Sequence, residues 1–135
     1  GGRLVVTLSV PQKASAEAAQ VARKALLGWY REKAAERLPE RVRNWAGKLG
    51  MGPPRVLIRE QSQRWASCDP AGNLRFNWRI VQAPMKLVDY VVSHELVHLE
   101  IRDHTVEFWA RLGEVLPDYD QRREQLRVIG KRLAW

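Results

Sequence analysis

The sequence predicts one α+β domain, in which N-terminal and C-terminal helices enclose a small antiparallel sheet. Three short segments, residues 55–60, 64–67 and 74–80, show the apolar alternation of strands, whereas the flanking sequence has helical apolar spacing. The sheet is expected to pack on a helix that contains residues 94–98. The chain has 135 residues, of which 45% are hydrophobic, and this is enough for a single domain with a buried core.

Residues 1–14 are expected to form a strand or arm at the N-terminus. Residues 3–10 alternate like a short strand, and Pro11 would end it. The chain starts with Gly1-Gly2 and not with methionine, so the arm could be the end of a longer natural N-terminus.

Two helices are expected next. The first should begin after an N-cap at Ser15 and break or kink at Pro39, because proline lacks an amide donor and clashes with the preceding turn. The second should cover residues 40–49, with Gly50 as its C-cap. The inner faces should carry apolar residues, with both tryptophans as core aromatics: Ala22, Leu26, Trp29 or Tyr30, the stem of Lys33, Arg37-Leu38, Val42, Trp45 and Leu49.

The second half of the chain is expected to continue with a turn and three helices. Asp, Pro and Gly within residues 69–72 predict a turn between two strands. A helix should start at Pro84, since proline is favoured at the first helical position. A further helix should follow His104 and end at Pro117, and a last one should run from about Tyr119 to Arg132.

All three histidines of the chain lie within eleven residues. On a helix, His94 and His98 are one turn apart and point from the same face, so both rings can reach one metal ion. Glu95 lies one step round the helix, which suits a base that takes a proton from zinc-bound water. If the helix ends before His104, this third ring can turn back to the ion and leave the fourth position to water.

Other interpretations of these residues stay open. Any single histidine could be an ordinary core or surface residue, but all three together with a neighbouring glutamate favour one catalytic zinc ion per chain. A glutamate, Glu107 or Glu114, could replace His104 as the third ligand. Cys68 is expected to be a small buried thiol and not a ligand, because three histidines already suffice.

The motifs resemble the YgjP-like or SprT-like zincin metallopeptidases. The resemblance covers roughly residues 29–126, and one position departs from it, because Ala66 stands where the family usually has glycine. It rests on these segments in order: Arg64-Trp65-Ala66-Ser67-Cys68, Gly72-Asn73-Leu74, Asn77-Trp78-Arg79, Asp89-Tyr90-Val91-Val92, the zinc motif, Phe108-Trp109 and Pro117-Asp118-Tyr119.

The resemblance implies a small zincin-like domain and a zinc-dependent hydrolase, most simply a metalloendopeptidase. Its ligands would be His94, His98 and His104, and Glu95 would be the base. An extended polypeptide would lie along strand 64–67 or strand 74–78, held by backbone hydrogen bonds. Four residues are candidates for substrate binding or for support of the site, although each also has an ordinary structural explanation: Arg64, Asn77, Arg79 and Tyr119.

The net charge of +8 lies entirely in the front half of the sequence. Residues 1–64 carry 13 Lys and Arg against 5 Asp and Glu, whereas residues 65–135 carry 10 of each. Such a basic half could contact a nucleotide or DNA. An arginine-rich composition explains it as well, since 17 of the 23 cations are arginine.

Three functions therefore compete with a simple zinc endopeptidase. The first is a hydrolase of nucleotide phosphoanhydrides. Against it, the sequence shows neither a Gly-rich phosphate loop nor a second cluster of carboxylates that could bind magnesium. A DNA-associated protease would use the basic front half. A non-enzymatic, metal-stabilised interaction module would have no need of Glu95.

The cellular setting is predicted from what the sequence lacks. A single cysteine excludes an intrachain disulfide, and no signal peptide or run of 18 apolar residues is visible. We therefore expect a monomer in the reducing cytoplasm that does not contact membranes.

Overall fold

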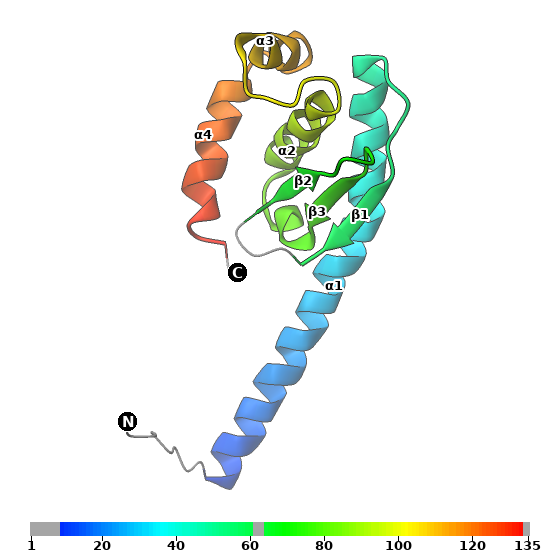
Figure 1. Ribbon diagram of the computed structural model, residues 1–135. Helices are drawn as coiled ribbons and strands as arrows, with labels where there is room; N and C mark the ends of the chain where they lie inside the picture. The colour runs from blue at the N-terminus through cyan, green and yellow to red at the C-terminus, as the bar shows by residue number, and fades with distance from the viewer. Residues whose placement is uncertain (1–8, 61–63, 134–135) are drawn as a thin grey trace, which may run out of the picture.

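The structure, a computed structural model, describes residues 9–60 and 64–133. Helix α1 passes along the sheet and extends well beyond the body of the domain, while α4 lies beside α2 on the opposite side of the molecule (Figure 1). The α+β class is confirmed. In chain order the elements are α1 (Val10–Leu49), β1 (Val56–Arg59), β2 (Ala66–Cys68), β3 (Leu74–Asn77), the 3-10 helix η1 (Trp78–Gln82), α2 (Met85–His98), α3 (Val106–Val115) and α4 (Tyr119–Gly130).

The start of α1 differs from the prediction. The helix has already begun at Pro11, which fits its first turn because no amide donor is needed there. Ser9, and not Ser15, is the N-cap. Its side chain accepts a hydrogen bond from the amide of Gln12, whose own side chain accepts one from the Ser9 amide, which is a capping box. Residues 1–8 of the predicted strand lie outside the described residues.

Helix α1 also continues through Pro39, so the two predicted N-terminal helices are one. An interior proline costs about 3 kcal/mol of helix stability. Leu38 and Val42, on either side of it, are completely buried. Burial of each such side chain contributes about 1.5–3 kcal/mol, which offsets the cost of the proline. The C-cap at Gly50 is confirmed, with a left-handed φ of 71°.

Only the C-terminal half of α1 belongs to the core. Leu26 and Trp29 were expected on its inner face, but they keep 52% and 50% of their surface exposed, and Ala22 is exposed too. Trp29 is therefore not a core aromatic, whereas Trp45 is. The residues of α1 that are buried are Ala34, Leu38, Val42, Trp45, Ala46 and Leu49.

The sheet is mixed and not antiparallel. Its strand order is β1-β3-β2, with β2 antiparallel and β1 parallel to β3. The connections allow this pairing. A tight turn at residues 69–72 reverses the chain between β2 and β3, as predicted. In the sequence β2 lies between β1 and β3, so the chain can turn back twice and β3 can run in the same direction as β1. Because β3 is central, β1 and β2 are the edge strands among the described residues.

Helix α2 is buried on almost every side, and one charged residue of this helix is buried with it. Asp89 is 7% exposed and receives two hydrogen bonds from Arg41 of α1, at 2.7 Å from Nε and 2.8 Å from Nη2. This contact raises the pKa of Arg41 above its ordinary value. The paired charges therefore clamp α1 to the helix that carries the histidines.

We expect Asp89→Asn to lower the free energy of unfolding by about 2 kcal/mol. The asparagine keeps the shape but leaves the Arg41 guanidinium without its charged partner in a half-buried position. Urea denaturation at a fixed zinc concentration measures the loss. Glu36→Gln, at an exposed position of α1, is the matched control, and equal stability of the two variants would contradict a clamp.

The two C-terminal helices are present as predicted, although α4 ends at Gly130 and not at Arg132. Of its predicted anchors, Leu126 is buried, while Ile129 and Leu133 are partly buried. Within the described part of the chain, no helix combines the length and apolarity needed to cross a membrane.

Candidate active site

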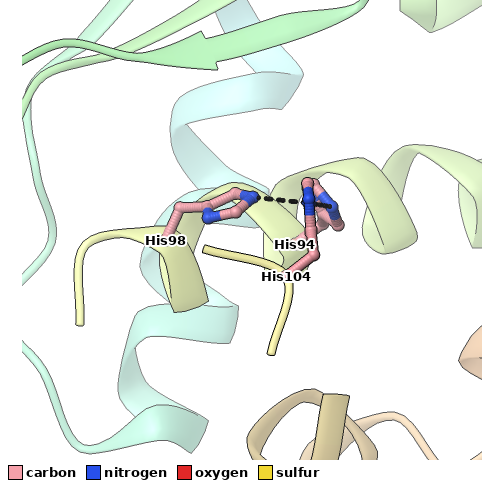
Figure 2. Close-up of side chains that lie close together, drawn as sticks. All are labelled: His94, His98 and His104. Atoms are coloured by element: carbon pink, nitrogen blue, oxygen red, sulfur yellow. Dashed lines mark hydrogen bonds between the residues drawn. The ribbon is translucent and has the colours of Figure 1, made fainter. Parts of the chain in front are cut away.

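The three histidine rings converge on one point. In Figure 2, His94 and His98 project from α2 toward His104 on the loop that follows it. The His104 Nε2 atom lies 3.0 Å from His94 Nε2 and 2.9 Å from His98 Nε2. Ligand nitrogens at ~2.0–2.1 Å from a tetrahedral zinc ion are about 3.3–3.4 Å apart, so the rings need to separate by only roughly 0.4 Å to hold zinc. No other such cluster of metal-ligating side chains occurs among residues 9–60 and 64–133.

The end of α2 explains how His104 reaches the other two rings. The helix ends at His98, and the amides of Glu100 and Ile101 both bond to the Val97 carbonyl in a tight turn. The His98 Nδ1 atom lies 3.0 Å from the Ile101 carbonyl oxygen and donates to it. This bond fixes the tautomer in which Nε2 has a free lone pair for a metal.

The surroundings of His104 favour its neutral, metal-binding form. Partial burial, the neighbouring rings of His94 and His98, and the positive charge of Arg123 together hold its pKa below the ordinary value. The structure thus places His104 with the two helical histidines. Of the alternative ligands, Glu107 is exposed on α3 and Glu114 is paired with Arg111.

Aromatic side chains of α3 support the three rings. Phe108 is fully buried, with its ring centre 5.0, 4.4 and 4.9 Å from those of His94, His98 and His104. Trp109 stacks on His104 at 5.5 Å. The sequence predicted both aromatics as residues of a C-terminal helix and as part of the family resemblance, but not as neighbours of the histidines. Their place four and five residues after the last histidine is the signal that could have assigned them to the site.

Glu95 lies beside the histidines in a cleft of about 620 Å³. It is 8% exposed, and its Oε1 atom is 3.4 Å from His94 Nδ1. Residues 64–70, which include β2, form one wall, and α2 forms the floor. The sequence did not predict four further residues that line this cleft: Tyr90, Val91, Arg102 and Leu126.

Arg64 alone of the four predicted supporting residues lines the cleft. Asn77 is buried and does not line the cleft. Its side-chain Nδ2 donates to the Arg64 carbonyl, and its Oδ1 accepts from the backbone amide of Arg79. The Arg79 side chain pairs with Glu60 at 2.7 Å. Asn77 therefore fixes the chain at the start of β2, and Arg79 contacts neighbours outside the cleft lining.

Neither the supporting candidate Tyr119 nor Cys68 belongs to the cluster of three histidines. Tyr119 stacks on Trp109 at 5.3 Å and so supports His104 indirectly. Cys68 lines the cleft and is only partly buried, not fully as expected. Desolvation and the charge of Glu95 raise the pKa of its thiol, which favours the protonated form.

The YgjP-like metallopeptidase domain family matches residues 6–128 of this chain. The chain belongs to the YgjP-like metallopeptidases. It is therefore a zinc-dependent hydrolase of the peptidase type, and the family implies a catalytic metal. No curated protein matches the chain.

Two solved structures share the fold of this YgjP-like domain. One is the metallopeptidase zymogen abylysin of Pyrococcus abyssi, with 21% identity and a TM-score of 0.62 over 70% of this chain and 93% of that one. The other is the metallopeptidase zymogen jannalysin of Methanocaldococcus jannaschii, with 24% identity and a TM-score of 0.59 over 70% and 95%. At these identities the similarity concerns the fold.

Proposed function

We propose that this chain hydrolyses peptide bonds with one zinc ion held by His94, His98 and His104, and with Glu95 as the general base. The observation that carries the proposal is that the His104 Nε2 atom lies 3.0 Å and 2.9 Å from the Nε2 atoms of His94 and His98, in the cleft that Glu95 also lines. A purely structural zinc site would normally add a fourth protein ligand and would need no such carboxylate.

The side chains would share the work as follows. When bound, zinc lowers the pKa of a coordinated water toward ~7 and polarises the scissile carbonyl. Glu95 accepts the proton of the attacking water and later delivers it to the leaving amine. The bond from His98 to the Ile101 carbonyl and the stacking of Trp109 on His104 hold the rings in place.

The substrate would lie along β2. This strand is the edge of the sheet that lines the cleft, so an extended polypeptide can add to it as a further strand. The other predicted edge, at residues 74–78, is wrong, because β3 is paired on both sides and the chain then turns into η1.

A substrate panel tests this function. Unfolded proteins and nucleoside triphosphates are incubated with the zinc-loaded wild type, and peptide fragments and inorganic phosphate are measured. We expect fragments and no phosphate, and the opposite result would favour the phosphoanhydride alternative. Contact with DNA stays a prediction, and two cations of the basic front half, Arg31 and Arg41, already pair with Glu60 and Asp89.

A further expected result concerns the loop that carries His104. Arg111 of α3 bonds to Glu100 on this loop, to Glu114 and to the Leu49 carbonyl at the end of α1. Arg111→Ala should weaken zinc binding about tenfold, because supporting residues of a metal site typically contribute ~10–100-fold. Competition with a zinc chelator measures the affinity. Arg132→Ala, at an exposed position, should keep the wild-type value.

A further inference from the structure

A second hollow opens beside the cleft, along the C-terminal half of α4. We call it the side pocket; its volume is about 360 Å³. It shares Trp65, Tyr90 and Leu126 with the cleft, so the two spaces adjoin each other. Its other lining residues belong to α4 or directly follow it: Arg123, Arg127, Gly130 and Lys131.

The side pocket is positively charged. Arg123, Arg127 and Lys131 are spaced by four residues and therefore lie on one face of the helix. No acidic residue lines the pocket among the residues that the structure describes. Arg127 pairs with Glu124, and the Arg123 guanidinium lies 5.0 Å from the centre of the Trp109 ring. No carboxylate of the described residues forms a salt bridge with Arg123 or Lys131. At least two cations are thus available to an anionic group from outside.

Gly130 has no side chain and therefore allows this charged face of α4 to approach Trp65 closely. A Cβ atom there would lie 3.3 Å from Cζ2 of Trp65, so a larger residue would push α4 away from the indole ring. Trp65 immediately precedes β2, the strand along which a substrate would lie. Tyr90, which is buried, lines both the cleft and the side pocket.

We propose that the side pocket is a specificity subsite that binds an acidic side chain of the polypeptide substrate. The proposal rests on the peptidase function above. Apolar surface of Trp65 and Leu126 would take the side-chain methylenes, and the cations at its rim would take the carboxylate.

The position of the subsite along the substrate follows from α2. Tyr90 is four residues before His94, which corresponds to about 6 Å along the helix. An extended polypeptide advances ~3.3 Å per residue. The acidic residue should therefore lie about two residues from the bond that is cleaved.

The test measures binding separately from cleavage. Two fluorescent ten-residue peptides that differ only in one Glu or Gln are titrated into Glu95→Gln protein loaded with zinc, at low ionic strength. We expect the Glu peptide to bind about fivefold more tightly, a range typical of partly exposed ion pairs, and the preference to fall as salt is added.

Paired variants locate the preference. Arg123→Gln with Lys131→Gln should bring the two affinities within twofold of each other. The matched control, Arg43→Gln with Arg132→Gln, removes the same charge at exposed positions outside the side pocket and should keep the preference. Zinc content and circular dichroism establish that each variant is folded. An equal loss of preference in both pairs, or no preference before substitution, would overturn the subsite.

Cleavage by the wild type then separates the two proposals. Cleavage of a mixed peptide library, with Asp or Glu enriched about two residues from the cut, supports both. Cleavage without such enrichment overturns the subsite and leaves the peptidase function. Selective binding of the Glu peptide without cleavage of any peptide overturns the peptidase function and leaves an acidic-peptide site.

Discussion

Glu95→Gln should lower peptide hydrolysis by ~10²–10⁴-fold and leave the zinc content near one ion per chain. Glutamine keeps the size of the side chain and most of its hydrogen bonding, but it removes the oxygen that accepts the proton. The site should tolerate this change because Glu95 is not one of the three converging side chains and contacts the histidine cluster through His94 at 3.4 Å. Turnover of an unfolded protein and metal analysis of the same preparation measure both quantities.

The matched control for this variant is Glu36→Gln. Glu36 is an exposed carboxylate on α1, and it lies outside the cleft lining. It should keep most of the activity. Loss of zinc from Glu95→Gln would make Glu95 a ligand or its essential support. Undiminished turnover would exclude it as the base.

The site was predictable because its geometry is local. The spacing of His94 and His98 fixes their common face on any helix, and a turn of a few residues is enough to return His104 to the same point. The supporting residues could not be predicted in this way, because their contacts join distant parts of the chain. The contact of Asn77 with the Arg64 carbonyl joins residues 13 apart, and the clamp between Arg41 and Asp89 joins residues 48 apart.

The errors in the predicted fold also arise from contacts between residues that are far apart in the sequence. Proline at position 39 is a strong local signal for a helix end, but the burial of its neighbours depends on elements much later in the chain. The direction of β1 relative to β3 depends on how the intervening chain is routed, and strands of four residues do not encode it. By contrast, the capping box of Ser9 and Gln12 is local, and the sequence already contained its signal.

His98→Ala and His104→Ala should each remove the metal and, with it, the activity. Zinc sites in small domains bind with ~10–16 kcal/mol, so the loss of one of three protein ligands should weaken binding by at least about 10²–10³-fold. Two features make the prediction specific to these rings. The Nε2 atoms of both contact each other at 2.9 Å, and the Nδ1 bond of His98 orients its ring toward that contact.

Glu107→Ala is the decisive control for the third ligand, because it removes the exposed carboxylate of the first turn of α3 without disturbing a described ion pair. It should bind zinc as the wild type does in a chelator competition, while His104→Ala should not. The reverse pattern, zinc retained by His104→Ala and lost from Glu107→Ala, would move the third ligand from the loop to α3. Thermal unfolding in excess chelator should then agree for His104→Ala and Glu107→Ala, since the exposed imidazole of His104 and the exposed carboxylate of Glu107 contribute little to the fold without metal.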